Sequence, residues 1–221
     1  MKNMDGLIIC AGFSSRMVSL KPLVELEGIP FLLNIILKLS RVCDRIFIIT
    51  GHRSAEIIHT AQNWLLREPK DRWLRQSGIP REQWALLFER LDFIYNPDYA
   101  QGMFGSLKIG LHSARNSRWI LYHFVDQPHL PPEFYRDFIR QREEGFDWIQ
   151  PTHGNKKGHP LILGQSIFDP IINFDKEGSL RSVVEKLPVR KKYWECPYPE
   201  VLYDMDTRSD VRKWGEANES L

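Results

Sequence analysis

Short apolar runs alternate with amphipathic stretches along the chain. Residues 6–12 (GLIICAG) and 45–52 (RIFIITGH) are brief, rich in isoleucine and closed by glycine-containing turns, which is typical of buried strands. Between them, apolar residues recur at helical spacing over residues 31–42, directly after Pro30, a residue suited to a first helical turn. The three segments predict a strand–helix–strand unit, in which a right-handed crossover joins two parallel strands.

The same alternation continues to the end of the chain. Further strands are predicted over residues 91–96, 119–126, 147–153, 159–163 and 189–197. Further helices are predicted over residues 54–68, 105–114, 131–145, 179–187 and 209–217. We therefore expect an α/β fold with a doubly wound, mostly parallel sheet and helices on both faces. The strands after residue 147 are closely spaced, so we expect them to form a small antiparallel appendage.

Residues 64–90 form an unusual connection between a predicted helix and the next predicted strand. They carry Trp64, Trp73 and Trp84 on an otherwise charged background, and they are long for such a connection. We expect a helical insertion that packs its tryptophans at the edge of a single domain spanning residues 1–221. An oligomer contact or a lid is the alternative interpretation.

The overall composition excludes several classes of partner. The net charge is +2 over 221 residues and the basic residues are scattered, so we expect neither a nucleic-acid nor a membrane partner. The spacing of Cys10, Cys43 and Cys196 fits neither a disulfide framework nor a zinc site. The sequence has no signal-peptide pattern and no apolar stretch long enough to cross a bilayer, so we expect a cytoplasmic protein.

The turn after the first predicted strand combines small residues with cations. Ala11 and Gly12 would let a ligand approach the backbone, where consecutive N–H groups form an anion-binding concavity. Arg16 offers a planar fork for phosphate oxygens, and Lys21 offers a point charge. The pattern matches neither G-x-G-x-x-G nor G-x-x-x-x-G-K-[ST]. The two interpretations are therefore a phosphate-binding loop and an ordinary turn whose cations face water.

Three aspartates are candidates for holding a cation. Asp126 follows an apolar run that should be a central strand, and ligands of open α/β sheets bind beyond the carboxyl ends of strands. Asp204 and Asp206 share one face if their segment is extended. Carboxylates combined with phosphate oxygens are the ligands that Mg²⁺ uses. The alternative for Asp126 is a turn aspartate ahead of a Gln-Pro pair.

Two further segments could contact a substrate. Gly102 and Gly105 give a permissive backbone before a helix that we expect to begin near Ser106, and a base or ribose could lie on this turn. His159 precedes Pro160 and could form a hydrogen bond with a substrate, although an isolated histidine is more often structural. We assign no transition metal, because His159 has no convincing set of partner ligands.

Five segments, taken in chain order, resemble the motifs of one enzyme family. They are LIICAGFSSRM with Lys21, NPDYAQGMFGSLKIGL, VDQPHL, KGHPLIL and DMDTRSD. They resemble L-A-A-G-x-S-x-R-M-G-x-x-K, N-P-x-x-x-x-G-M-x-x-S-L-x-x-G, G-D-Q-P-x-L, R-G-H-P-V-x-x and D-I-D-T-P-E-D of the MobA-like nucleotidyltransferases. The most similar branch is the molybdenum cofactor cytidylyltransferases, and the matches cover nearly the whole chain.

The resemblance implies an enzyme with a single Rossmann-like nucleotidyltransferase domain. It would transfer a nucleotidyl group from an NTP to a phosphate of an acceptor and release pyrophosphate. In the most similar branch the NTP is CTP and the acceptor is molybdopterin carrying molybdenum, so a molybdoenzyme would receive the product. The guanylyl branch tends to have L-A-G-G where this chain has Ile9-Cys10-Ala11-Gly12. The added methyl group of Ala11 favours a smaller pyrimidine, and hence CTP.

The resemblance also implies roles for individual residues. The nucleotide-binding residues would be Ala11, Gly12, Ser14, Ser15, Arg16, Lys21, Gly102 and Ser106, and the acceptor-binding residue would be His159. Arg16, Lys21 and Asp126 would be catalytic, with the two cations neutralising the phosphates. Asp126 would be the main Mg²⁺ ligand and Asp204 the second, with Asp206 a near alternative.

Two other functions remain open at this point. One is a nucleotidyltransferase for another phosphorylated small molecule, such as a sugar or alcohol phosphate. The other is a non-catalytic protein that binds a nucleotide or the molybdenum cofactor for a partner enzyme. Val18 stands where the family has glycine and favours the non-catalytic protein, because valine does not readily adopt positive φ. Retention of both cations and of two aspartates favours an enzyme.

Overall fold

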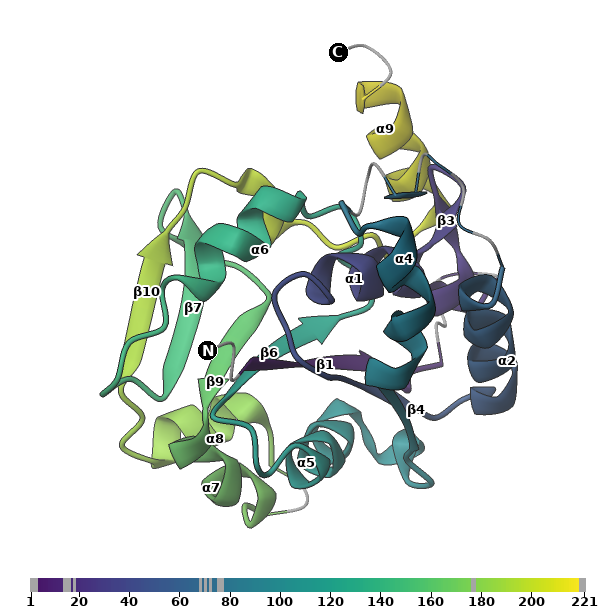
Figure 1. Cartoon of the computed structure of the whole chain (residues 1–221). Helices are drawn as coiled ribbons and strands as arrows, with labels where there is room; N and C mark the ends of the chain where they lie inside the picture. Colours follow the sequence, from purple (N-terminus) through teal and green to yellow (C-terminus); the bar gives the residue numbers. More distant parts are fainter. Residues whose placement is uncertain are drawn as a thin grey trace.

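One mixed β-sheet forms the centre of the molecule (Figure 1). The computed structural model describes residues 4–13, 17, 19–67, 69, 71, 73–74, 78–175 and 178–218, with side chains to residue 215. The sheet has the strand order β10-β7-β9-β6-β1-β4-β5, and β8 pairs with β7. Its strands are β1 (Met4–Cys10), β4 (Ile46–Thr50), β5 (Leu91–Tyr95), β6 (Trp119–Phe124), β7 (Trp148–His153), β8 (Lys156–Lys157), β9 (Leu161–Gly164) and β10 (Lys191–Glu195).

Most neighbouring strands of this sheet run parallel. The exceptions are β9, which is antiparallel to both β6 and β7, and β8, which is antiparallel to β7. The short strands β2 (Glu25–Leu26) and β3 (Ile29–Pro30) form a separate antiparallel sheet. The predicted fold class, an open and mostly parallel α/β sheet with a small antiparallel addition, is therefore confirmed.

The strands after residue 147 do form antiparallel pairs, as predicted, but they do not form a separate appendage. The strands after residue 147 belong to the main sheet, where β7 and β10 pair in parallel. Strand β9 reverses direction between two strands of the main sheet, and the two-residue strand β8 is antiparallel to β7 at its side. A short apolar run looks the same whichever way the strand points, so its sequence could not reveal the reversal.

Helices cover both faces of the sheet (Figure 1). The α-helices are α1 (Phe31–Leu39), α2 (Ser54–Leu65), α4 (Arg81–Trp84), α5 (Met103–Ser113), α6 (Pro132–Ile139), α7 (Phe168–Ile172), α8 (Leu180–Lys186) and α9 (Arg208–Asn218). Short 3₁₀ helices are η1 (Lys21–Leu23), η2 (Ala85–Arg90), η3 (Tyr99–Gln101), η4 (Gln165–Ile167) and η5 (Pro199–Leu202). Helices α1 and α6 lie on one face, α5, α7 and α8 on the other, and α9 projects at the top of the view.

Strand β1 shows why the sheet has a core on each side. Its side chains alternate between the two faces, as a pleated strand requires. Ile8 belongs to the apolar cluster under α1 and α6, whereas Leu7 and Ile9 belong to the cluster under α5, α7 and α8. Helix α5 packs closely because a Cβ at Gly110 would lie 2.4 Å from Leu7 Cδ1. The continuous apolar run of β1 therefore reflects burial on both faces.

The described part of residues 64–90 packs its tryptophans inside the chain. The ring centroids of Trp64 and Trp73 are 4.7 Å apart, and those of Trp73 and Trp84 are 6.1 Å apart. These rings form an apolar cluster with Leu33 and Leu37 of α1. Trp84 also donates its indole N–H to the backbone oxygen of Leu65 at 2.9 Å. This packing agrees with the favoured interpretation of the insertion, whereas the single-domain boundary of 1–221 stays a prediction.

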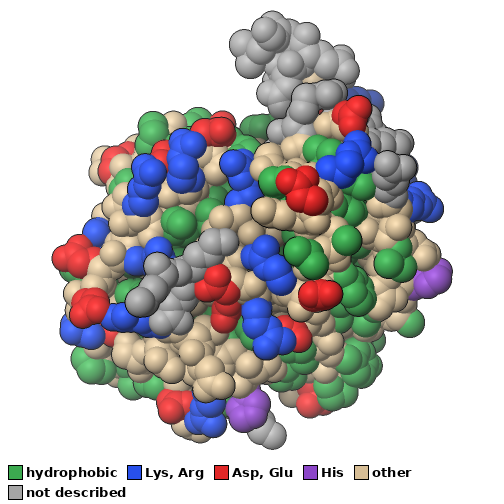
Figure 2. All heavy atoms as spheres, viewed as in Figure 1, with side chains coloured by type: hydrophobic (Ala, Val, Ile, Leu, Met, Phe, Trp, Pro, Cys, Tyr) green, Lys and Arg blue, Asp and Glu red, His purple; other side chains and the backbone are tan. Residues whose placement is uncertain are grey.

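The surface carries both signs of charge. On the face shown in Figure 2, Lys and Arg side chains are interspersed with Asp and Glu side chains, in keeping with the net charge of +2. Among the described residues, no helix has the length and apolar character needed to cross a membrane.

Asp147, just before β7, ties together three segments of the chain. Its carboxylate accepts hydrogen bonds from the Arg190 side chain at 3.1 and 3.0 Å, from the Arg190 backbone N–H at 2.9 Å, and from the Ser166 hydroxyl. The Arg190 guanidinium is the main cause that lowers the pKa of Asp147 to about 2. The carboxylate is therefore more acidic in the folded chain than in the unfolded one.

We expect Asp147→Asn to lower the free energy of unfolding by about 2 kcal/mol at pH 7. Because the folded pKa is lowered, this stabilisation is complete above the unfolded pKa of about 3.9 and is lost as the pH falls through about 2. Urea unfolding between pH 7 and pH 3 should show the difference between the two proteins shrinking. A difference that stays constant over this range would remove Asp147 ionisation as its source.

The control is Asp169→Asn, which removes the exposed ion pair of Asp169 with Arg115, at 2.6 Å on the surface of α7. Exposed pairs contribute little, so we expect a change below about 1 kcal/mol.

Candidate active site

A cavity of about 310 Å³ opens beyond the carboxyl ends of β1 and β6. Residues 9–13 and 124–126, which end these two strands and begin the following loops, form part of its wall. The start of α5, the 3₁₀ helices η1 and η3, and Asp206 complete it. This is the edge where open α/β sheets bind ligands.

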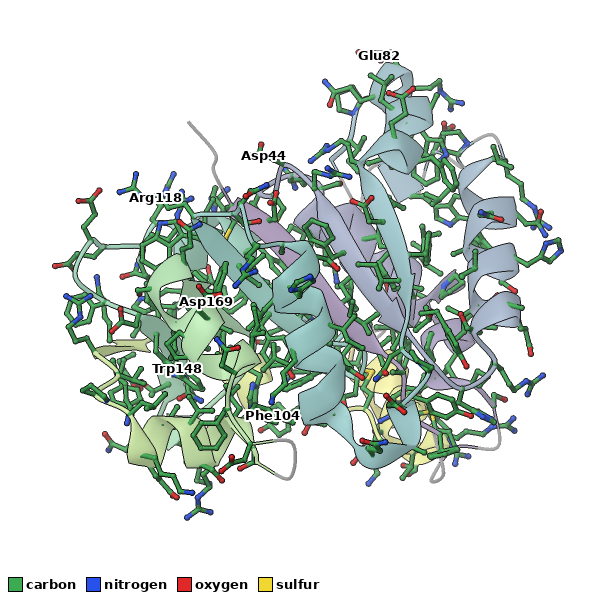
Figure 3. All side chains as sticks on the ribbon, turned by 90° about the horizontal axis from the view of Figure 1, so that it is seen from below. Asp44, Glu82, Phe104, Arg118, Trp148 and Asp169 are labelled. Atoms are coloured by element: carbon green, nitrogen blue, oxygen red, sulfur yellow. The ribbon has the colours of Figure 1, made fainter. Side chains whose placement is uncertain are left out.

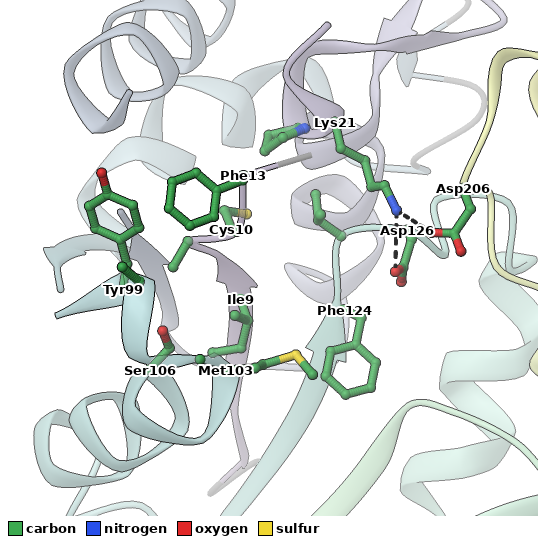
Figure 4. Close-up of a pocket in the computed structure, with 16 residues that line it drawn as sticks. Ile9, Cys10, Phe13, Lys21, Tyr99, Met103, Ser106, Phe124, Asp126 and Asp206 are labelled. Carbon is green, nitrogen blue, oxygen red and sulfur yellow. Dashed lines mark hydrogen bonds and ion pairs between the residues drawn. The ribbon is translucent and has the colours of Figure 1, made fainter. Parts of the chain in front are cut away.

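A lysine and two aspartates form the charged end of this cavity (Figure 4). Lys21 Nζ donates a hydrogen bond to Asp206 Oδ1 at 2.6 Å and lies 3.6 Å from Asp126 Oδ2. The three residues come from η1, from the loop after β6 and from the segment before α9. The fold thus brings together charges that lie up to 185 positions apart in the sequence.

The surroundings of Asp126 disfavour the charged form of its carboxylate. Burial is the main cause that raises the pKa of its carboxyl group; Lys21 opposes this effect, and Asp204 and Asp206 add to it. Within the described part of the chain, its buried Oδ1 atom has no hydrogen-bond partner. The loop after β6 is held by a backbone hydrogen bond, in which the N–H of Met205 donates to the Asp126 carbonyl at 2.8 Å. Unpartnered carboxylate oxygens at a ligand-facing position are a feature of sites that bind cations.

The segment that carries Asp206 is fixed by the start of α9. Asp210 Oδ2 accepts hydrogen bonds from the backbone N–H groups of Asp206 at 3.1 Å and Thr207 at 2.8 Å. Thr207 Oγ1 accepts in return from the Asp210 N–H at 3.2 Å. This reciprocal cap holds the backbone at Asp206, so the side chain can reach the cavity.

These residues fit a divalent metal. Asp126 and Asp206 supply two carboxylates, one with a buried oxygen that has no hydrogen-bond partner among the described residues. The described residues contain no cluster of three or more His, Cys, Asp or Glu arranged to hold a metal. Mg²⁺ commonly binds one or two carboxylates and takes its other ligands from water and substrate phosphates.

A second cavity of about 870 Å³ adjoins the first and shares Gly102, Met103 and Phe124 with it. Figure 3 shows Phe104 and Trp148, two of its lining residues, on the face covered by α5, α7 and α8. The other aromatic rings of its wall include Tyr122, Phe124 and Tyr193, and its charged residues are the cations Lys157, Arg181 and Lys191 and the single carboxylate Glu185. Such a lining suits a flat ring system that carries negative charge.

His159 lies in this second cavity, not in the first. Its ring meets the edge of Phe124 at a centroid distance of 4.8 Å. Burial is the main cause that lowers its pKa, and Asp204 acts in the opposite direction. Its buried Nδ1 atom has no hydrogen-bond partner among the described residues. Burial therefore favours the neutral imidazole, and one of its ring nitrogens keeps an unused hydrogen-bonding capacity within the described part of the chain.

Comparison with known proteins decides the family. Residues 6–191 match the MobA-like NTP transferase domain. The chain belongs to this family. It is therefore a nucleotidyltransferase, as its sequence motifs predicted.

One curated relative of this MobA-like transferase matches over almost its full length. The molybdenum cofactor cytidylyltransferase of Escherichia coli strain K12 is 28% identical over 211 residues, which are 95% of this chain and 94% of the relative. That enzyme supports the predicted branch of the family.

Solved structures share the fold of this MobA-like transferase. A nucleotidyl transferase from Methanothermobacter has a TM-score of 0.70 at 19% identity, covering 98% of both chains. Molybdopterin-guanine dinucleotide biosynthesis protein A of Archaeoglobus fulgidus has a TM-score of 0.67 at 14% identity, covering 98% of this chain and 100% of its own. A Mycobacterium tuberculosis H37Rv protein in complex with manganese has a TM-score of 0.66 at 17% identity, covering 97% and 98%.

The MobA-like fold collects most of the predicted site residues in one place. The predicted residues that line the first cavity are Ala11, Gly12, Lys21, Gly102, Ser106, Asp126 and Asp206. Asp204 lines neither cavity, and its Oδ1 accepts a hydrogen bond from Gln127 Nε2 at 3.0 Å. Ser14, Ser15, Arg16 and Val18 lie outside the described residues.

The first cavity of this MobA-like transferase has room beside two of its glycines. A Cβ placed on Gly12 or Gly102 would meet no atom of the described residues within 4 Å, chain neighbours aside. Gly102 has a φ of +111°, a conformation that favours glycine, and it directly precedes α5. The helix begins at Met103, so the expectation that it starts near Ser106 was wrong: the chain enters helical geometry as soon as Gly102 has turned.

Sequence reasoning missed several residues of this MobA-like site. Asn96 is fully buried and donates to Ser106 Oγ at 2.9 Å, which fixes the serine hydroxyl at the cavity wall. Phe13 and Tyr99 lie side by side in the first cavity, although 86 positions separate them. The NPDY segment gave a turn signal for Asn96, but nothing in the sequence indicated that Phe13 and Tyr99 meet.

Proposed function

We propose that the protein is a Mg²⁺-dependent cytidylyltransferase that transfers CMP from CTP to the phosphate of molybdopterin and releases pyrophosphate. The observation that carries this proposal is the junction of the two cavities. One has a lysine and two carboxylates, and the other has aromatic walls and cations. The 28% identical cytidylyltransferase supports the choice of CTP and of molybdopterin.

The nucleotide would lie in the first cavity. Gly12 and Gly102 leave the backbone open to a ligand, Ala11 forms part of the same wall, and Ser106 presents a fixed hydroxyl. Lys21 would neutralise charge at the reacting α-phosphate, with Arg16 as a further phosphate ligand. The methyl group of Ala11 narrows this wall relative to glycine, which supports a pyrimidine over guanine.

Asp126 and Asp206 would hold the Mg²⁺ ion, which supplies charge stabilisation for the leaving pyrophosphate. We rank Asp206 above Asp204 as the second carboxylate, because Asp206 lines the cavity whereas Asp204 bonds to Gln127. The manganese in the Mycobacterium tuberculosis structure supports a divalent metal at a fold of this kind.

The acceptor would lie in the second cavity. The aromatic side chains would pack against its ring system, and the cations would hold its negative charge. His159 would contact it through the ring nitrogen that has no partner among the described residues. The shared wall at Gly102, Met103 and Phe124 would bring the acceptor phosphate close to the nucleotide.

The transfer of CMP requires positioning of the two substrates more than it requires proton transfer. An oxygen of the acceptor phosphate attacks the α-phosphorus of CTP, and the bond to the pyrophosphate oxygen breaks. The attacking oxygen is already anionic, so no strong general base is required. Holding both substrates in line and neutralising their charge supplies most of the catalysis.

The location and the partners belong to the same proposal. Cys10, Cys43 and Cys196 are all buried thiols, which supports a reducing compartment such as the cytoplasm. A molybdoenzyme would receive the product.

A pyrophosphate-release assay tests the proposal. The purified protein with Mg²⁺ is combined with each of the four NTPs and with molybdopterin, a sugar phosphate or an alcohol phosphate. We expect release with CTP and molybdopterin above all other pairs. Pyrophosphate release with a different acceptor only would show that molybdopterin is not the acceptor. Binding of CTP without pyrophosphate release in any pair would support the non-catalytic alternative.

A further inference from the structure

The cavity that takes the nucleotide has an aromatic end as well as a charged end. In Figure 4 the rings of Phe13 and Tyr99 stand together on one side of the cavity, while Lys21, Asp126 and Asp206 stand on the other. A nucleoside triphosphate has the same polarity, with a flat base at one end and the phosphates at the other.

Phe13 is a large apolar residue with an exposed side chain. Its side chain is 52% exposed, although it lies in the wall of a cavity and follows directly on Gly12. An exposed aromatic ring at the mouth of a cavity is more informative than scattered apolar surface, because it offers a dry face to a ligand.

The ring is held in place by two neighbours. Its centroid lies 5.2 Å from that of His52 and 5.3 Å from that of Tyr99, with tilted planes. Tyr99 is in turn seated against Gly51, where a Cβ would lie 2.4 Å from Tyr99 Cβ and 2.7 Å from the Ala11 carbonyl. These contacts brace one side of the Phe13 ring and order it before a ligand arrives, which lowers the entropic cost of binding.

We propose that Phe13 is the surface on which the base of the bound NTP stacks. The inference rests on the proposed function, since it assigns the base of that nucleotide to the aromatic end of the cavity. Stacking on an aromatic ring tolerates every base, because each base has a π-face. Phe13 therefore supplies affinity, and the choice between CTP and the other NTPs comes from other contacts.

Binding of CTP, GTP and inorganic tripolyphosphate to the wild-type protein and to Phe13→Ala, each with Mg²⁺, tests this assignment by calorimetry. We expect the affinity for CTP to fall about 5- to 150-fold in the variant. The affinity for GTP should fall by a similar factor, whereas that for tripolyphosphate, which has no base, should not change. Phe13→Trp should bind CTP at least as well as the wild type.

Kinetics give a second readout and a control. Stacking that is equal in the ground and transition states predicts a raised KM for CTP with an unchanged kcat in Phe13→Ala. Phe88→Ala is the matched control, because Phe88 is 38% exposed on η2 and lines neither cavity.

The outcomes separate this inference from the proposed function. Equal CTP binding by the wild type and Phe13→Ala would overturn the stacking role alone. Equal loss of CTP and tripolyphosphate would also overturn it, because the variant would then have changed the phosphate end. If the wild type binds no NTP, the proposed function fails and this inference fails with it.

Discussion

Asp126→Asn should reduce pyrophosphate release by at least about 10³-fold while the protein stays folded. The substitution keeps the size of the side chain but removes the charge of the carboxylate with the buried oxygen. Mg²⁺ would lose its main ligand, so charge on the leaving pyrophosphate would no longer be balanced. The rate should be measured with saturating CTP and acceptor, so that weaker binding does not contribute.

The same variant should melt no earlier than the wild type at pH 7. The folded pKa of Asp126 is raised by burial and by the neighbouring aspartates, so the ionised carboxylate destabilises the fold at neutral pH. A neutral amide avoids that cost. Asp169→Asn, at an exposed position of α7 (Figure 3), is the control and should leave the rate unchanged and shift the melting temperature only slightly. Normal turnover in Asp126→Asn would remove Asp126 from the metal site.

Lys21→Met should slow transfer about 10²- to 10³-fold, which is the size of effect seen when one donor to a developing charge is lost. Methionine keeps the apolar stem of the side chain and removes only the ammonium group. The free energy of unfolding should fall by about 1–2 kcal/mol, because the variant loses the interactions with Asp206 and Asp126. The barrier to transfer should therefore change more than the stability.

Single-turnover rates and urea unfolding, measured on the same preparation, decide this point. Lys186→Met serves as the control, since Lys186 is exposed at the end of α8 and lines neither cavity. An unchanged rate in Lys21→Met, with only the loss of stability, would return Lys21 to a structural role.

The pattern of apolar residues predicted those parts of the fold that depend on burial along a single segment. The apolar run of β1 and the helical spacing of α1 are readable because burial is nearly continuous along the strand and apolar residues recur every three to four residues along the helix. Asp126 was predicted from one local fact, its place just after a buried strand. These features needed no knowledge of which segments meet in space.

Other parts of the site depend on contacts that no short window contains. The choice between Asp204 and Asp206 turns on Gln127, which binds the first, and on Lys21, which binds the second. The meeting of Phe13 with Tyr99 depends on the absence of a side chain at Gly51. Each is a product of the assembled sheet, so sequence spacing alone could not provide it.

The reversal of β9 has a consequence for how the two cavities of this protein are built. Because β9 runs against its neighbours, its beginning, not its end, meets the carboxyl ends of β6 and β7. His159 therefore lies at this edge of the sheet just before β9 begins, whereas Asp126 lies there just after β6 ends. The two cavities are therefore lined by connections of opposite direction, so substitutions near residue 159 can reshape the second cavity while the loops after β1 and β6, which line the first, keep their course.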